Sequence, residues 1–384
     1  MLSNQRHLFS LPEGTHYLNC AYLSPLLKSV EAAGIAGMRL KSNPTRITVP
    51  EFFRDSEALR AALGAIVNAE ADRIGLIPSA SYGTAIAVRN VPVRRGQNVV
   101  IPGDEFPSNV YGWREACQEQ GAQMRLVPRP KDAQHPARAW TERLLDAIDR
   151  DTAAVCLSAV HWTDGTRFDL VALGRRAREA GAYYIVDGTQ SVGALPFDFA
   201  AVQPDLLLVA GYKWLLGPYQ CGFVAVGDRL MGGKPIEYNW INRDHSEDFN
   251  LILSYRDGYQ PGARRFDVGE HSNFIGVPML LAAAKQILAW GVPEIQRYCE
   301  ALQAPLAQAL EDTPFRIAPA VDHAAHLFGV PLPDPARAPA ILEELKRRDV
   351  WVSLRGTYIR VSPHVYNTPE NMQTLADVLR KAGK

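Results

Sequence analysis

The sequence predicts an α/β protein with a large domain built on a mostly parallel sheet between layers of helices, and a smaller α+β domain beside it. The first observation is that short apolar runs alternate with amphipathic stretches from about residue 70 onward. This alternation is typical of parallel strands connected by helices. The second observation is that polar and charged residues directly follow several of these runs. In such folds, ligands bind beyond the carboxyl ends of the strands.

The expected strands are short runs rich in aliphatic and β-branched residues. They are Arg73–Ile77, Asn98–Ile101, Gln123–Val127, Ala153–Ser158, Tyr183–Val186, Asp205–Val209 and Gly222–Val226. Between the earlier strands, apolar residues recur at helical spacing. The expected helices are Tyr82–Val91, Ser108–Gln120, Ala139–Asp149 and Asp169–Ala180.

After residue 213 the pattern changes to loops, followed by helical segments. We expect a long helix over Gly276–Trp290, an amphipathic one over Glu294–Leu310, and a helix, short strands and a final helix between residues 338 and 381. We therefore predict that residues 1–45 join the small domain, residues 46–270 form the large domain and residues 271–384 form the small C-terminal domain.

The composition excludes several classes of protein. Lys plus Arg and Asp plus Glu both number 41, so no net charge favours nucleic acid or an anionic membrane. No apolar run is long enough to span a bilayer, and the first ten residues lack a signal peptide's apolar core. Five scattered cysteines have no metal-ligand spacing, so we expect reduced thiols, no metal site and a cytoplasmic setting.

The most informative residue is Lys213, the one ammonium in the otherwise apolar segment 206–218. A buried lysine has a lowered pKa and can form an imine with an aldehyde. Upstream, the apolar run Tyr183–Val186 ends on the carboxylate of Asp187. A carboxylate that holds a pyridinium proton is the other half of pyridoxal phosphate chemistry. The structural alternative is that Lys213 extends its ammonium to solvent from a strand end.

Other candidates follow earlier strands. Ala80 and Ser81 open a helix, where free backbone N–H groups can bind an anion, although Ser81 can equally be a simple N-cap. Phe106 can lie flat on a planar ring or pack as a core aromatic beneath the next helix. Ser158 ends a further strand, and Trp162 lies four residues beyond it.

His161 and Trp162 are suited to contact a ligand ring, and a satisfied structural histidine is the commoner alternative for His161. Gln190 is placed so that its amide could reach a ring oxygen, and Tyr212 offers a phenol beside Lys213. Near the C-terminus, Arg355 and Arg360 alternate with apolar residues. A guanidinium in such a place makes a bidentate carboxylate clamp, and a solvated strand-edge charge is the alternative.

In this order, the motifs resemble the class V aminotransferase superfamily of pyridoxal phosphate enzymes, whose members have the fold-type I architecture. The most specific parts are Val186–Gly193 (VDGTQSVG) and Gly211–Trp214 (GYKW), the latter followed by Gly217 and Pro218. Several pieces are similar to the kynureninase branch. These are residues 106–109 (FPSN), 158–162 (SAVHW), 212–213 (YK), 272–273 (SN) and 359–363 (IRVSP).

The resemblance implies a role for each matching residue. Lys213 would carry the internal aldimine and move the proton at the substrate α-carbon, with Tyr212 beside it. Asp187 would pair with the pyridine nitrogen, and Phe106 would stack on the ring. The cofactor-binding residues implied are Ala80, Ser81, Phe106, Ser158, Trp162, Asp187, Gln190, Tyr212, Lys213 and Asn273.

The resemblance also implies partners. Asn273 would reach the phosphate of a neighbouring subunit, so the active site would lie at the interface of a homodimer. Arg360 would hold the substrate α-carboxylate, with Arg355 as a second candidate. Cysteine desulfurases carry a mobile cysteine before the C-terminal arginine region, and here no cysteine follows Cys299. Persulfide chemistry of that type is therefore disfavoured.

These roles predict an aminotransferase-type reaction on a small amino acid, through an external aldimine and removal of the α-proton by Lys213. A β-lyase, either kynureninase-like or a C–S lyase, is the alternative, and an amino-acid epimerase or racemase is a further one. All three use the same residues. The alternative of a non-catalytic regulator is disfavoured, because the sequence has no room for a DNA-binding domain. A dinucleotide-binding enzyme is disfavoured because no Gly-x-Gly-x-x-Gly motif follows a strand.

Overall fold

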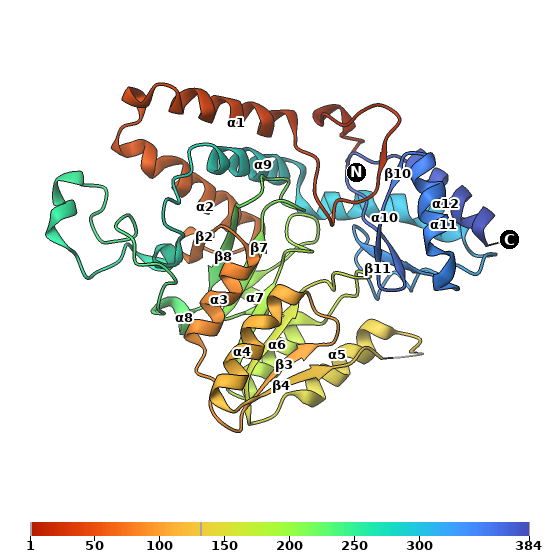
Figure 1. Cartoon of the computed structure of the whole chain (residues 1–384), viewed down its shortest axis with the longest axis horizontal. Coiled ribbons are helices and arrows are strands. Elements are labelled where there is room, and N and C mark those ends of the chain that lie inside the picture. Colours follow the sequence, from red (N-terminus) through yellow and green to blue (C-terminus); the bar gives the residue numbers. More distant parts are fainter. Residues whose placement is uncertain (1, 131–132, 384) are drawn as a thin grey trace.

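The computed structural model describes residues 2–130 and 133–383, so the ends of the predicted domains at Met1 and Lys384 lie outside the described residues. Within them, a seven-stranded sheet has the order β2-β8-β7-β6-β5-β3-β4 and lies between layers of helices (Figure 1). The strands are β2 (Ile74–Ile77), β3 (Asn98–Pro102), β4 (Gln123–Val127), β5 (Thr152–Ser158), β6 (Tyr183–Asp187), β7 (Leu206–Ala210) and β8 (Gly222–Val226).

Neighbouring strands from β7 to β4 run parallel, and β8 is antiparallel to both β2 and β7. The prediction of a mostly parallel sheet is therefore confirmed. The helices that accompany it are α1 (Lys28–Lys41), α2 (Arg54–Val67), α3 (Ala80–Asn90), α4 (Tyr111–Gln120), α5 (Pro136–Ala147), α6 (Leu170–Glu179), α7 (Phe199–Val202), α8 (Asp228–Met231) and α9 (Gly276–Trp290).

The strands read as continuous apolar runs because both faces of the sheet are buried. Along β3, Val99 and Ile101 point into the core shared with α3 and α4. Val100, between them, belongs to the core on the opposite face, to which α2, α5, α6 and α9 contribute. Side chains alternate across a strand, so each strand supplies both cores.

Helices α1 and α2 are not among the elements that the sequence predicts. In α1, Ile35 and Met38 are exposed, so its apolar residues are not confined to one stripe and the helical periodicity is weak. Tertiary contacts fix both helices instead, since each packs against α9. Within the described ranges, no helix combines the length and apolar character needed to cross a bilayer.

A third core lies in the C-terminal part of the chain, around a three-stranded antiparallel sheet in the order β11-β12-β9. Its elements are β9 (Phe328–Pro331), β11 (Ser353–Arg355), β12 (Tyr358–Val361), α10 (Val292–Ala309), α11 (Ala338–Arg347) and α12 (Pro369–Ala382). Strand β1 (His16–Tyr17) pairs with β10 (Val350–Trp351) of the same part. These contacts support the proposal that the N-terminal segment belongs to a small C-terminal domain.

One buried ion pair ties α2 to the chain that follows the large sheet. The Arg60 guanidinium pairs with the Asp267 carboxylate, and both side chains are almost fully buried. Arg60 Nη1 also donates to the carbonyl of Ile74 at 2.7 Å, and Asp267 Oδ1 accepts from the Leu76 N–H at 2.7 Å. The ion pair and these two hydrogen bonds thus join α2, β2 and the segment around residue 267.

Removing Asp267 should therefore be strongly destabilising. Asp267→Ala leaves the Arg60 charge buried and the Leu76 N–H without an acceptor, so we expect the free energy of unfolding to fall by about 3–5 kcal/mol. Urea denaturation followed by circular dichroism measures this change. Asp228→Ala removes the partner of Arg73 in an exposed pair and should cost less than about 1 kcal/mol. Equal losses in both variants would contradict the assignment.

Candidate active site

A cavity of about 370 Å³ lies where the carboxyl ends of the parallel strands meet. Ser158 ends β5, Asp187 ends β6, and Lys213 follows the end of β7. Nine of the residues that the sequence singles out line this cavity: Ala80, Ser81, Phe106, Ser158, Trp162, Asp187, Gln190, Tyr212 and Lys213. Asn273, Arg355 and Arg360 do not line it.

Lys213 is buried, with 7% of its surface exposed, so the alternative of a lysine extended to solvent is wrong. Its Nζ lies 5.5 Å from the centre of the Phe106 ring and 5.4 Å from that of Tyr212. Burial and the nearby charge of Arg360 lower the pKa of Lys213 to about 8, against an opposing influence of Asp187. Near neutral pH, an appreciable fraction of such amines is uncharged and nucleophilic.

Asp187 faces the same cavity and is held by two hydrogen bonds. Asn109 Nδ2 donates to its Oδ2 at 2.7 Å, and the Thr189 N–H donates to its Oδ1 at 2.8 Å. Burial nevertheless raises the pKa of the Asp187 carboxyl, and the Glu105 carboxylate adds to this shift. A cationic partner in the cavity would restore the ionised form.

Two of these supporting residues have no role in the sequence interpretation. Asn109 belongs to the FPSN motif, and its amide oxygen accepts a hydrogen bond from Thr84 Oγ1 at 3.1 Å. That bond leaves the amide nitrogen to face Asp187. Glu105 is buried and accepts from Ser158 Oγ at 2.6 Å and from the Ser158 N–H at 2.8 Å. The Ser158 hydroxyl proton is thus committed to Glu105 rather than free for a phosphate.

The start of α3 offers an anion site on the cavity wall. Ser79, not Ser81, is the N-cap, since its hydroxyl accepts from the Tyr82 N–H at 3.2 Å. The N–H groups of Ala80 and Ser81 have no partner within the helix, and the Ser81 hydroxyl lies 2.9 Å from that of Ser79. Backbone donors at a positive helix end bind phosphate groups well.

The aromatic and amide side chains near the cavity differ in their burial and in the hydrogen bonds that they already make. Phe106 is only half-buried, which contradicts the core-aromatic alternative. Its ring packs edge-on against that of Trp162, with 5.5 Å between the ring centres. The Trp162 indole N–H donates to the carbonyl of Asp104 at 2.7 Å. The Gln190 amide donates to the carbonyl of Ala21 and accepts from Trp214, so one N–H remains for a ligand. His161 is fully buried and bonded to neighbouring groups, as a structural histidine is.

Arg360 is a buried charge with few hydrogen-bond partners. Its side chain is 1% exposed, and its Nη1 donates to the carbonyl of Trp162 at 2.9 Å. Its Nε and Nη2 have no partner among the described residues. Burial and the neighbouring Arg355 lower the pKa of Arg360 to about 9. Buried guanidinium donors that lack an acceptor are costly, so this arrangement calls for an anionic ligand.

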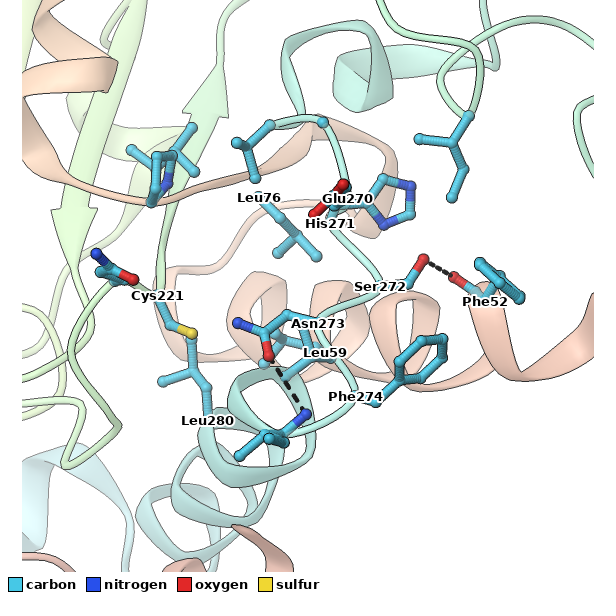
Figure 2. A pocket seen from close by; sticks show the side chains of 18 of the residues that line it. Phe52, Leu59, Leu76, Cys221, Glu270, His271, Ser272, Asn273, Phe274 and Leu280 are labelled. Atoms are coloured by element: carbon cyan, nitrogen blue, oxygen red, sulfur yellow. Dashed lines mark hydrogen bonds between the residues drawn. The ribbon is translucent and has the colours of Figure 1, made fainter. Parts of the chain in front are cut away.

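Asn273 lies in a second pocket of about 640 Å³ (Figure 2). Its Oδ1 accepts from the Gly276 N–H at 2.8 Å at the start of α9, so it acts as a helix cap. The two pockets are adjacent because Pro78 and Gln220 line both. Asn273 is therefore near the Lys213 cavity without facing it.

The groups around the cavity fit pyridoxal 5′-phosphate. Lys213 offers a buried amine for an aldehyde, Asp187 a carboxylate for a ring N–H, and Phe106 a flat face for the ring. The start of α3 offers donors for a phosphate. Two nitrogens of Arg360 have no partner in the described part of the chain, and a carboxylate is the kind of group that would satisfy both.

Residues 48–375 match the family described as Aminotransferase class-V. Among similar proteins are a "Probable cysteine desulfurase" of Methanothermobacter thermautotrophicus, 25% identical over 85% of this chain and 84% of the relative, and the "Uncharacterized aminotransferase YcbU" of Bacillus subtilis, 26% identical over the same shares. A solved structure, the "Complex between the cystine C-S lyase C-DES and its reaction product cysteine persulfide", superposes with a TM-score of 0.83 at 20% identity, covering 96% of this chain and 98% of that one.

The family match covers most of the chain, and the structural likeness shows the same fold over nearly its whole length. The predicted fold-type I architecture and the predicted cofactor, pyridoxal 5′-phosphate, are confirmed. The protein is accordingly an enzyme of the transferase or lyase kind that uses this cofactor. The chain belongs to the class-V aminotransferase family.

Proposed function

We propose that this enzyme is a β-lyase that cleaves the C–S bond of cysteine-derived amino acids. The observation that supports an amino-acid substrate is the buried Arg360. Two of its nitrogens have no partner among the described residues, and the third donates to the carbonyl of Trp162, which lines the cavity of Lys213 and Asp187. A lyase is supported by relatives whose names include a cysteine desulfurase and a cystine C–S lyase. These names favour the lyase alternative over the aminotransferase reaction that the sequence alone suggested.

Each residue has a defined task in this proposal. Arg360 binds the α-carboxylate and so fixes the α-carbon relative to the Lys213 amine. Lys213, neutral in part near pH 8, removes the α-proton. Asp187 holds the proton on the ring nitrogen, oriented by Asn109. The cofactor supplies an electron sink for the pair released from the C–H bond.

The overall reaction balances without a further reactant except water. The α-proton passes to Lys213, and the Cβ–S bond breaks with its electron pair leaving on sulfur. The sulfur takes up a proton and departs as a thiol. Addition of water to the remaining three-carbon unit gives pyruvate and ammonia.

The cysteines support release of the sulfur fragment rather than its transfer to the protein. All five are buried. Burial raises the pKa of every one of their thiols, so none is a reactive thiolate. A mechanism with a protein persulfide needs an accessible low-pKa cysteine.

Transamination is the second candidate. It is favoured by the family description and by a relative named as an uncharacterized aminotransferase. It would use Lys213 and Arg360 in the same way, with a keto acid as amino-group acceptor. The two reactions therefore differ in their products and not in these residues.

We also propose a homodimer in which the pocket around Asn273 meets the partner subunit beside the Lys213 cavity. The adjacency of the two pockets supports it, because a residue of a second copy at Pro78 and Gln220 would border both.

The five free cysteines are consistent with the cytoplasmic setting that the sequence suggests.

The products separate the two reactions. With S-methyl-L-cysteine, the holoenzyme should release pyruvate, ammonia and methanethiol in equal amounts without any added keto acid. L-Alanine, which has no β-substituent to expel, is the control and should give no ammonia. A keto acid that retains the S-methyl group, formed only when a second keto acid is added, would overturn the lyase and establish transamination.

Lys213 should show its lowered pKa when the apoenzyme captures the cofactor. The neutral amine attacks the aldehyde, so the capture rate should rise with pH, with a midpoint near 8, and level off above it. The visible absorption of the bound cofactor measures the rate. Lys213→Ala should lose the band and reduce kcat by roughly 10²–10⁴-fold. Lys285→Ala, at an exposed site on α9, should behave as the parent.

Replacement of Arg360 should separate substrate binding from stability. Arg360→Met keeps most of the side-chain volume and removes an unpaired buried charge, so unfolding should need no less urea than in the parent. The KM for amino acids should nevertheless rise about 10–100-fold, since charge-assisted hydrogen bonds contribute about 1.5–3 kcal/mol. The affinity for the cofactor should stay within about twofold. A large fall in stability with an unchanged KM would assign Arg360 a structural role.

A further inference from the structure

Arg355 and Arg360 point to the same face of the small antiparallel sheet. In the register of β11 and β12, Ser353 pairs with Arg360 and Arg355 pairs with Tyr358. Residues two apart on a strand share a face, so Arg355 and Arg360 are diagonal neighbours. Their Cβ atoms are therefore about 7 Å apart, within reach of one extended amino acid held between the two guanidinium groups.

Trp162 connects both arginines to the Lys213 cavity. Arg360 donates to its carbonyl at 2.9 Å, and the Arg355 guanidinium lies 5.8 Å from its ring centre. Trp162 itself lines the cavity. The two guanidinium groups thus flank one residue at the edge of the reaction site.

Arg355 has no acidic partner among the described residues. Its Nη1 donates at 2.7 Å to the carbonyl of Leu354, which is a neighbour in sequence, and its side chain is half-buried. Burial lowers the pKa of Arg355, and its charge in turn disfavours the charged forms of Arg360 and Lys213. By contrast Arg129, which lies 5.7 Å from the Tyr358 ring centre, is paired with Asp164.

Two guanidinium groups, those of Arg355 and Arg360, therefore stand at Trp162 on the edge of the cavity that Asp187 faces, and neither has an acidic partner among the described residues. The α-carboxylate of an amino acid would satisfy Arg360 alone. The charge of Arg355, the diagonal neighbour of Arg360 on the same face, would then still lack a counter-charge. A second anion on the same molecule would remove this imbalance, and a planar guanidinium next to an indole ring is well suited to a carboxylate.

We propose that Arg355 binds an acidic group at the far end of the substrate, so that the enzyme prefers amino acids with a carboxylate beyond the β-sulfur. This inference rests on the proposed lyase function and names its substrate class. A solvated strand-edge charge, the alternative reading of Arg355, would give no preference for such substrates.

The test compares S-(2-carboxyethyl)-L-cysteine with its neutral analogue, S-(2-carbamoylethyl)-L-cysteine. The holoenzyme should turn over the acid with a kcat/KM at least tenfold above that of the amide. Arg355→Gln should lower kcat/KM for the acid about 10–100-fold, mainly through KM, and should change kcat/KM for the amide by less than about threefold, since it also removes a charge that acts on Lys213. Arg355→Lys should keep part of the preference. Arg347→Gln, at an exposed site on α11, is the control and should change neither substrate.

Titration of the cofactor absorption with each compound separates the two proposals. If the acid binds more tightly, Arg355→Gln removes this advantage and no thiol is released, then the lyase fails and the role of Arg355 stands. If thiol is released from both compounds with equal kcat/KM, the lyase stands and the role of Arg355 is overturned. Equal binding of the two compounds, or binding of neither, also overturns it.

Discussion

The chemistry of the site depends on the burial of one amine, Lys213, beyond the end of β7. Its desolvation is unfavourable for the charged form, and the nearby Arg360 makes the charge still less favourable. Asp187, at the end of the neighbouring strand, opposes this effect across the cavity. The sheet is what brings these groups together, because parallel strands end at one edge and place their following residues side by side. A reactive amine near neutral pH is the consequence.

The chain contains two kinds of buried arginine, and the difference distinguishes structure from function. Arg60 is fully paired, since Asp267 and the Ile74 carbonyl accept its hydrogen bonds. Arg360 is equally buried but leaves two nitrogens without an acceptor. A buried charge whose donors all have acceptors holds elements together. A buried charge with donors that lack acceptors lowers the stability of the fold unless a ligand supplies the acceptors. The excess of positive charge beside Trp162 is therefore a property of the site and not of the fold.

The loop after β5 joins the large sheet to the small one. The Gly329 N–H of β9 donates to the carbonyl of Asp164 at 2.9 Å, and Arg360, the cross-strand partner of Gly329, donates to the carbonyl of Trp162. A side chain at residue 329 would meet the Asp164 Cβ at 2.8 Å, so only glycine allows this approach. The position of the arginine face relative to Lys213 is thus set by contacts between segments about 165 to 200 residues apart.

The sequence by itself determined the strands of the large sheet, because residues buried on both faces leave unbroken apolar runs, and it singled out Lys213 and Asp187 as charges attached to such runs. The tertiary structure decided which neighbours act on them. Asn109 orients Asp187, and Glu105 accepts the hydroxyl proton of Ser158, through hydrogen bonds from the segment after β3 to the ends of β6 and β5, which are far away in sequence. Likewise, the strand register places Arg355 and Arg360 on one face of the small sheet, and packing buries Arg360. No local sequence pattern indicates either fact. Contacts between residues that are far apart in sequence are decided by packing, whereas the sequence pattern of a segment indicates only its local preference for helix or strand.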